Sequence, residues 1–199
     1  MPNDFSVSGV ILAGGESRRM GVDKAGLVFE GKTFLERIIE SMKGIFEETL
    51  VVGRRKGDEE AYFVPDLREG AGPLGGIYTG LFFSPSFWTL FVPCDMPFLE
   101  PSLYEKLLQA RDPGGRRLAA FLSEDRQRIE HFPLLVPKPY LRVVRHRLEI
   151  GENSVRSFLN RAQIEGVELG EFERGKIKSF NTPEEYEHLL TQSKEVCLG

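Results

Sequence analysis

The stretch Val10–Lys24, which reads VILAGGESRRMGVDK, lies near the amino end of the chain. The apolar run over 7–13 predicts a buried strand. Two adjacent glycines follow at once, and glycine lets the backbone approach a bound group and point N–H groups at it. Arg18, Arg19 and Lys24 add three cations to this loop, although the chain as a whole is acidic. The combination favours a phosphate site over the alternative, a surface turn with scattered basic residues.

The thirteen positions from Leu12 to Lys24 resemble the signature loop of the molybdenum cofactor guanylyltransferases. The shared pattern is Leu-Ala-Gly-Gly-x-Ser-x-Arg-Met-Gly-x-Asp-Lys, within the wider sugar-nucleotide type of nucleotidyltransferases. Related cytidylyl- and uridylyltransferases usually carry Ala-Ala-Gly where this chain has Ala-Gly-Gly, so the resemblance favours the guanine branch. It implies a GTP site made of Leu12, Ala13, Gly14, Gly15 and Lys24.

Two aspartates extend the resemblance. The most hydrophobic run, 88–92, predicts a central strand that delivers Asp95 at its carboxyl end, where open α/β sheets bind ligands. A carboxylate oxygen there suits Mg²⁺ on a triphosphate, and Cys-Asp-x-Pro-Phe resembles the family's metal-aspartate motif. Asp66 matches a nucleotide-contacting aspartate of the family, which implies that it helps to hold the guanosine. The structural alternative for each is a turn or helix-cap residue.

Apolar periodicity and turn residues predict alternating strands and helices. Strands are expected at 7–13, 49–53, 61–64, 88–92, 117–122, 129–136, 164–169 and 177–180. Helices are expected at 33–42, 77–83, 102–110, 140–148 and 154–160, and from Pro183 onward. Such alternation implies a mostly parallel sheet covered on both faces.

With 199 residues, the chain has room for one substantial domain and little for two. We therefore expect a single domain over 1–199, a three-layer α/β/α sandwich with a Rossmann-like sheet. The resemblance implies the nucleotide-diphospho-sugar transferase type of this fold. It also implies a nucleotide-binding half over about 1–100 and an acceptor-binding half over about 101–199.

Two other glycine motifs compete for the nucleotide. Gly26–Thr33 has the Walker A spelling, but the residues before it are polar and its interior, Leu-Val-Phe-Glu, prefers an extended path. Gly70–Gly75 has the spelling of a dinucleotide fingerprint, yet Pro65–Glu69 separates it from its strand. We interpret the second motif either as a rigid turn that starts a helix or as a lining of the base or ribose.

Composition excludes several classes of protein. A net charge of −4 argues against a general binder of nucleic acid or anionic membranes, because such binding needs a basic surface. No apolar run approaches the roughly 20 residues of a membrane span, and residues 1–8 lack a signal-peptide pattern. We therefore expect a cytoplasmic protein. Cys94 and Cys197 have neither disulfide-framework nor CxxC metal spacing.

The resemblance thins after about residue 100. Asn181-Thr182-Pro183-Glu184 is similar to a late Asn-Thr-Pro-Glu segment of the family, but Ser179 stands where an asparagine is expected. Gly53 departs in the same way, because many relatives have an asparagine after the second strand. His131 lies in a segment that resembles the family's His-Pro-Leu, with one residue inserted. It is a candidate substrate-side residue, although a lone histidine is more often structural.

The reaction that the resemblance implies is nucleotidyl transfer. A terminal phosphate of molybdopterin, or of Mo-molybdopterin, attacks the α-phosphorus of GTP, and pyrophosphate leaves. Arg19, Lys24 and Asp95 are the candidate catalytic residues, Asp95 is the ligand of a Mg²⁺ cofactor, and no side-chain nucleophile is needed. Other cofactor-biosynthesis or molybdoenzyme-maturation proteins are candidate partners. The alternatives are a cytidylyl- or sugar-nucleotide transferase, a Walker-type NTPase and a non-catalytic nucleotide-binding module.

A basic excess between Lys138 and Arg156 raises a separate hypothesis about the acceptor. Arg142 and Arg145 are three residues apart on an expected helix, so they share a face. That face is either a solvated surface or a site for the acceptor, a pterin phosphate whose negative charge has to lie beside GTP.

Overall fold

The computed structural model describes residues 6–14, 23–53 and 61–196. Its large sheet has seven strands in the order β5-β4-β1-β6-β8-β7-β9. The strands are β1 Val7–Leu12, β4 Glu48–Val52, β5 Tyr62–Val64, β6 Trp88–Pro93, β7 Leu118–Leu122, β8 Ile129–Pro137 and β9 Ile164–Val167. Pairing is parallel between β5, β4, β1 and β6 and between β7 and β9, while β8 is antiparallel to both of its neighbours. The expected mostly parallel sheet is confirmed.

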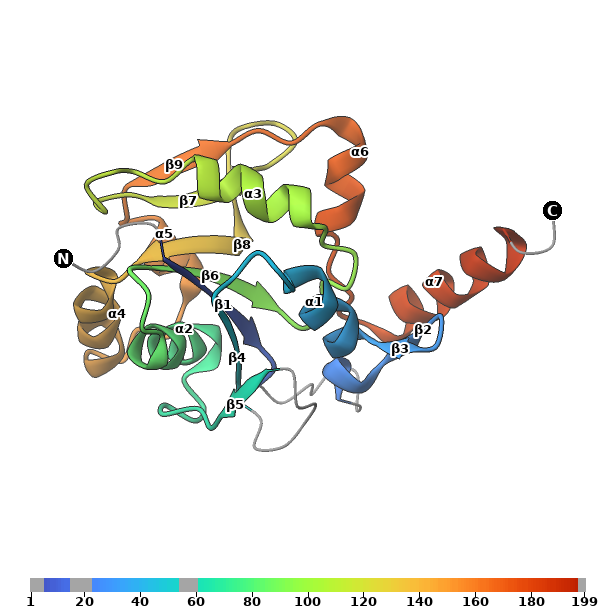
Figure 1. The fold of residues 1–199 in the computed structure, drawn as a ribbon, viewed down its shortest axis with the longest axis horizontal. Coiled ribbons are helices and arrows are strands. Elements are labelled where there is room, and N and C mark those ends of the chain that lie inside the picture. Colours follow the sequence, from blue (N-terminus) through green and yellow to red (C-terminus); the bar gives the residue numbers. More distant parts are fainter. Residues whose placement is uncertain (1–5, 15–22, 54–60, 197–199) are drawn as a thin grey trace.

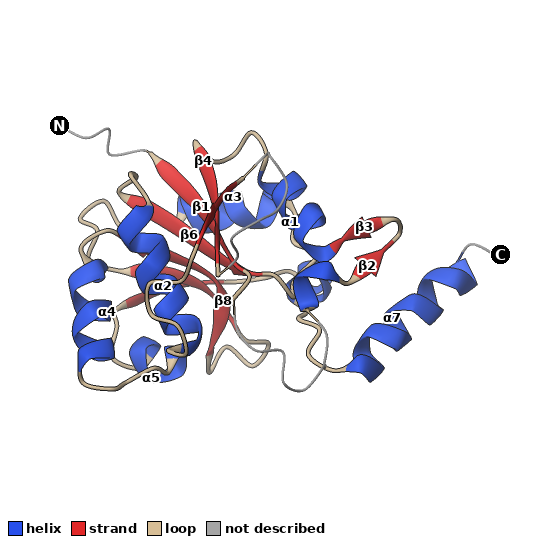
Figure 2. Cartoon of the chain, turned by 90° about the horizontal axis from the view of Figure 1, so that it is seen from below, coloured by secondary structure: helices blue, strands red, loops and turns tan. Residues whose placement is uncertain are grey.

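Helices cover both faces of this sheet. The helices of the described residues are α1 Phe34–Met42, α2 Gly72–Phe83, α3 Pro101–Gln109, α4 Tyr140–Glu149, α5 Val155–Leu159, α6 Glu171–Arg174 and α7 Pro183–Val196, with 3-10 turns η1 Lys24–Gly26 and η2 Gly175–Ile177, and α1 to α5 supply the cover. Ile11 of β1 packs in one buried cluster with side chains of α1 and α3, and Val10 packs in another with α2, α4 and α5. Successive residues of a strand point to opposite faces, so the three-layer α/β/α sandwich is confirmed (Figures 1 and 2).

The carboxyl ends of three central strands meet at one edge of the sheet. All six residues of β1 are buried, as expected for a parallel strand with helices on both faces. The strand register pairs Leu12 with Val52 of β4 and with Pro93 of β6. The residues that follow these strands, Ala13, Gly53 and Cys94–Asp95, therefore emerge side by side at this edge.

The segment with the Walker A spelling forms a small β-hairpin outside the large sheet. Its strands are β2 Val28–Phe29 and β3 Lys32–Thr33. Glu30 and Gly31 turn the chain between them with φ of 51° and 80°, the left-handed conformation that tight hairpin turns need. The hairpin and α7 lie together beyond the sheet in both views (Figures 1 and 2). The expectation of an extended path here is confirmed.

Two local expectations are wrong. Residues 177–180 form no strand: Ile177 ends η2, and the Phe180 backbone N–H donates to the Asp95 carbonyl at 3.0 Å rather than to a sheet neighbour. The helix expected from residue 102 begins at Pro101, because proline lacks a donor and has a fixed φ that suits the first helical position. Among the described residues, no helix combines the length and the apolar character needed to cross a lipid bilayer.

Candidate functional site

The end of β1 is tied to both neighbouring strands. The Ala13 backbone N–H donates to the Val52 carbonyl at 2.9 Å, and the Cys94 N–H donates to the Leu12 carbonyl at 3.1 Å. Ala13 is half-buried and Gly14 is exposed, so the chain reaches solvent directly after these bonds. Leu12 and Ala13 are thus fixed at the end of the sheet, and Gly14 presents the exposed backbone with which a phosphate-binding loop can begin. Gly15 and Arg19 lie outside the described residues.

Gly14 and Gly53 approach each other backbone to backbone. A Cβ built on Gly53 would lie 2.3 Å from the Gly14 Cα, and the φ of Gly53 is +92°, a conformation that side chains rarely adopt. The Gly53 N–H also donates to the Val64 carbonyl at 3.0 Å, and this bond fixes Gly53 beside the end of β5. The departure from the family's asparagine is therefore a packing requirement of this chain, because a side chain here would displace the Gly14 loop.

Lys24 links three distant segments of the chain. It begins η1, whose N-cap Asp23 accepts a hydrogen bond from the Ala25 N–H at 3.1 Å. The Lys24 Nζ donates to Asp95 Oδ2 at 3.0 Å and to Asn181 Oδ1 at 2.7 Å. The Lys24 and Asp95 side chains are only 18% and 15% exposed, so their ion pair is partly shielded from water.

Asn181 is a site residue that sequence reasoning did not single out. Its amide donates to Ser179 Oγ at 2.9 Å while its carbonyl oxygen accepts from Lys24. The neighbouring Phe180 N–H holds the segment against the Asp95 carbonyl. The Asn-Thr-Pro-Glu segment was the available signal, but nothing in the sequence indicates that it meets Lys24 across 157 positions. Ser179, the departure from the family pattern, is the partner that orients the Asn181 amide.

The donor set at Asp95 fits one mode of magnesium binding. Groups of three or more histidine, cysteine, aspartate or glutamate side chains that could cage a metal are absent from the described residues. Mg²⁺ commonly binds one or two carboxylates and takes its remaining ligands from substrate phosphates and water. A single half-buried carboxylate beside Lys24 and the Gly14 loop has that character.

Asp66 lies on the loop between β5 and α2. Its Oδ1 accepts hydrogen bonds from the Arg68 N–H at 3.0 Å and from Thr79 Oγ1 at 2.7 Å. The Leu67 N–H donates to the same Thr79 hydroxyl at 3.0 Å. These contacts fix the turn that leads into α2, where Gly72–Pro73 begins the helix. The contacts match the turn-residue alternative and leave the nucleotide role of Asp66 a prediction.

A cleft of about 920 Å³ opens beside Asp95 and Asn181. Its walls include Arg128 from the β7–β8 loop, His131 from β8 and Arg156 from α5. Among the described residues, no carboxylate forms an ion pair with Arg156. Arg156 is a member of the basic stretch over 138–156, and it lines this cleft. Arg142 and Arg145 do not, and Arg145 is paired with Glu149 at 2.8 Å on the exposed side of α4.

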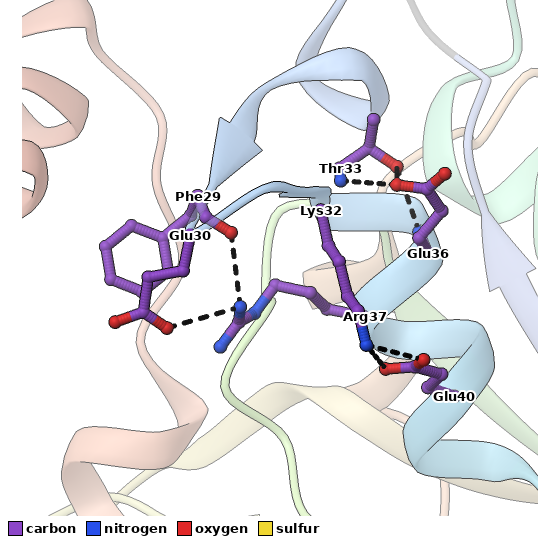
Figure 3. Close-up of polar contacts among 7 residues, drawn as sticks. All are labelled: Phe29, Glu30, Lys32, Thr33, Glu36, Arg37 and Glu40. Carbon is purple, nitrogen blue, oxygen red and sulfur yellow. Dashed lines mark hydrogen bonds and ion pairs between the residues drawn. The ribbon is translucent and has the colours of Figure 1, made fainter.

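The lysine of the Walker A spelling has a different partner. Figure 3 shows the Lys32 Nζ between the two carboxylate oxygens of Glu40, at 2.7 Å from each. Thr33, which would hold magnesium in a Walker site, instead caps α1 by accepting from the Glu36 N–H at 3.1 Å. A Walker loop wraps phosphates with the turn between a strand and its helix, whereas this segment is a paired hairpin. The Walker interpretation is therefore excluded by the local fold.

Comparison with known proteins gives one family. The family described as "MobA-like NTP transferase domain" matches residues 9–167. A molybdenum cofactor guanylyltransferase of Haemophilus influenzae is 32% identical, over 89% of this chain and 94% of the relative. A probable molybdenum cofactor guanylyltransferase of Methanosarcina mazei is also 32% identical, over 94% of this chain and 92% of the relative.

Solved structures show the same fold. The molybdopterin-guanine dinucleotide biosynthesis protein A of Archaeoglobus fulgidus aligns with a TM-score of 0.76 at 21% identity, over 94% of this chain and 99% of that one. The 2-C-methyl-D-erythritol 4-phosphate cytidylyltransferase of Thermus thermophilus aligns with a TM-score of 0.67 at 18% identity, over 95% and 99%. The fold is that of the nucleotide-diphospho-sugar transferases, as expected.

Proposed function

The chain belongs to the family of MobA-like NTP transferase domains, and on this premise we propose that it transfers GMP from GTP to the terminal phosphate of molybdopterin. The product is the guanine dinucleotide form of the cofactor, and pyrophosphate leaves. The observation that carries the proposal is the meeting of Lys24, Asp95 and Asn181 at the ends of β1 and β6. Asp95 and Asn181 of this cluster also line the cleft, so a second phosphorylated substrate bound there would lie beside Lys24.

The chain's own residues act on the nucleotide mainly by position and charge. The backbone of Leu12–Gly14, continued by Gly15, receives the phosphates, and Lys24 and Arg19 neutralise their negative charge. An oxygen of the acceptor phosphate forms a bond to the α-phosphorus. The bond from this phosphorus to the bridging oxygen breaks, and pyrophosphate takes the electron pair. The protein accelerates the transfer by holding the acceptor phosphate and the α-phosphate of GTP in line for this attack.

Asp95 is the residue that would hold Mg²⁺. The ion, when bound, neutralises charge on the triphosphate. The same carboxylate pairs with Lys24. In this proposal the Lys24 amine exchanges Asp95 for phosphate oxygens when the nucleotide binds. Its contact with Asn181 keeps the Lys24 amine near the site during that exchange.

The cleft beside Asp95 is the proposed site of the acceptor. Arg156 and Arg128 offer guanidinium groups to a pterin phosphate, and His131 lines the same wall. In this proposal about residues 1–100 form the nucleotide half and about residues 101–199 the acceptor half, although Asp95 of the first half also lines the cleft. Asn181 crosses that division, because it belongs to the second half and contacts Lys24 of the first.

A cytidylyl- or sugar-nucleotide transferase on the same fold is the second candidate, since a cytidylyltransferase from T. thermophilus shares the architecture. Pyrophosphate release distinguishes the two when the protein receives each of the four NTPs, Mg²⁺ and molybdopterin. Release with GTP that depends on molybdopterin supports the proposal. Release with CTP alone, or with a sugar phosphate in place of molybdopterin, would identify the other reaction.

A further inference from the structure

A third hydrophobic cluster lies outside the two faces of the large sheet. Its buried members come from the hairpin segment, α1 and the chain before α7: Leu27, Phe29, Phe34 and Phe180. Phe98, which follows Asp95 by three residues, packs against it. Ring centroids lie 5.4 Å apart for Phe29 and Phe98 and 5.8 Å apart for Phe98 and Phe180, both edge to face. We call this group the aromatic cluster.

The aromatic cluster joins the three segments that carry the site. Leu27 and Phe29 follow Lys24 closely, Phe98 follows Asp95, and Phe180 directly precedes Asn181. The Leu27 N–H donates to the Lys24 carbonyl at 3.2 Å, which couples the start of the hairpin to the lysine. Because edge-to-face rings have a preferred mutual geometry, the packing of these rings sets the relative positions of Lys24, Asp95 and Asn181.

Arg37 is a charged side chain of α1 that contacts two of these segments at once. Its guanidinium carbon lies 5.0 Å from the centroid of the Phe29 ring and 5.8 Å from that of Phe98. Its NH1 donates to the Phe29 carbonyl at 3.2 Å and lies 3.5 Å from Glu30 (Figure 3). The side chain is 23% exposed, so these contacts are partly shielded from solvent.

We propose that Arg37 is a positioning residue for the transfer reaction. It holds the hairpin against the loop that contains Phe98, and so it keeps the Lys24 and Asp95 side chains at the correct distance from each other. This inference rests on the proposed function, but Arg37 lies apart from the reacting phosphates and is not a catalytic residue. The Glu30 side chain is 59% exposed and 3.5 Å from Arg37, so this ion pair contributes little. The flat guanidinium, which stacks on rings and reaches a backbone carbonyl at the same time, carries the effect.

The expected phenotype separates positioning from simple stabilisation. A residue that only stabilises the fold would lower the melting temperature of Arg37→Ala and leave the kcat of the folded protein unchanged. A positioning residue changes kcat, because Lys24 and Asp95 act on the reacting phosphates. The KM for GTP changes less, since the backbone of the Gly14 loop still binds the nucleotide. We expect kcat to fall about tenfold and the KM for GTP to stay within about twofold.

Hydrogen exchange of the ligand-free protein gives a readout independent of activity. In Arg37→Ala, amides of 23–34 and 94–99 should exchange faster, whereas those of β7 and β9 should keep their wild-type rates. Arg117→Ala is the matched control, because it removes an exposed arginine whose ion pair with Glu165 at 2.6 Å lies at the far edge of the sheet. It should change neither the two site segments nor kcat.

Arg37→Lys is the second variant and serves if Arg37→Ala does not fold. It keeps a cation near the Phe29 ring and loses the planar fork, so its kcat should fall between those of the wild type and Arg37→Ala. Wild-type kcat and unchanged exchange in the Arg37 variants would overturn the inference alone. If the wild-type protein releases no pyrophosphate from any nucleotide, the proposed function fails, and the exchange measurement still decides whether Arg37 holds the two segments together.

Discussion

The Lys24 side chain connects two other polar residues of the candidate site, Asp95 and Asn181. Its amine contacts a carboxylate and an amide oxygen at 3.0 and 2.7 Å, from residues that are 71 and 157 positions away in the sequence. These two partners hold the Lys24 amine in place at the candidate site. Lys32 offers the contrast, because its amine is satisfied by Glu40 on an exposed surface where both side chains are about half exposed.

Substitution of the two lysines should therefore have opposite outcomes. Lys24→Ala should lower kcat/KM for GTP at least about tenfold, the loss expected when a charge-assisted contact to phosphate is removed. Lys32→Ala should leave turnover unchanged, since an exposed ion pair contributes at most about 1 kcal/mol to stability. Pyrophosphate release and calorimetric GTP binding measure both. A severe defect at Lys32 beside a mild one at Lys24 would return the nucleotide to the Walker-spelled segment.

Asp95→Asn tests the metal assignment. The asparagine keeps the volume and an oxygen that can accept from Lys24, but it loses the charge that Mg²⁺ requires. Catalysis should fall on the order of a hundredfold or more while the melting temperature changes little. Both quantities are measured on one preparation, with Mg²⁺ varied up to saturation. Full activity at saturating Mg²⁺ would make Asp95 a structural residue.

At the scale of elements, the amino ends of the strands contain a polar group that is separate from the site. Glu48 begins β4 and accepts a hydrogen bond from the Ser8 hydroxyl of β1 at 3.3 Å. Burial raises the pKa of the Glu48 carboxyl, outweighing that hydrogen bond and the nearby Lys138 charge, which lower it. The folded state thus disfavours the ionised carboxylate.

The stability of the fold should carry this signature. A group with a raised folded-state pKa contributes its stability fully below the unfolded value, and the contribution is lost as pH rises through the folded pKa. Glu48→Gln keeps an acceptor for Ser8 and cannot ionise. Its free energy of unfolding should match that of the wild type in acid and exceed it near neutral pH. Urea unfolding from about pH 4 to pH 7 measures the difference, which should shrink as pH falls; a difference that grows toward acid would contradict the assignment.

Local patterns predicted the elements where the local chemistry was complete. The Thr33–Glu36 capping box that starts α1 is present in full, and the buried strands around 10 and 90 lie where apolar runs placed them. The strand expected at 177–180 was wrong because a short segment bounded by Ile177 and Phe180 has the same sequence whether Phe180 enters a sheet or an aromatic cluster. The deciding contact, from the Phe180 N–H to the Asp95 carbonyl, is long-range and leaves no trace in the sequence.

The candidate site, like the secondary structure, could be predicted from the sequence only in part. Asp95 comes just after β6, and Lys24 belongs to the sequence motif that begins at the end of the neighbouring β1, so the parallel order of these strands predicted that the two residues belong to one site. Asn181 arrives from the far end of the chain, and no periodicity reports that approach. Arg142 and Arg145 share a helix face as expected, but the packing of α4 on α2 puts that face away from the cleft lining. Spacing identifies a shared face and does not say what the face meets.

The arginines of the basic stretch over 138–156 differ in their relation to the cleft. Arg156 lines it, whereas Arg142 and Arg145 do not. Arg156→Ala should raise the KM for molybdopterin roughly 5- to 50-fold, the range for losing one hydrogen-bonded charge, and should leave GTP binding unchanged. The double variant Arg142→Ala with Arg145→Ala is the control, because neither residue lines the cleft. Steady-state kinetics with each substrate varied in turn makes the comparison. A raised KM in the double variant alone would place the acceptor on α4.

The most direct measurement follows the phosphorus atoms of GTP. The protein is incubated with Mg²⁺ and molybdopterin and with GTP labelled at either the α- or the γ-phosphorus, and the products are separated. Attack at the α-phosphorus predicts that the α-label appears in the pterin dinucleotide and the γ-label in pyrophosphate, both only when molybdopterin is present. Release of the γ-label as orthophosphate, with the α-label left on GDP, would contradict nucleotidyl transfer and with it the roles given to Lys24 and Asp95.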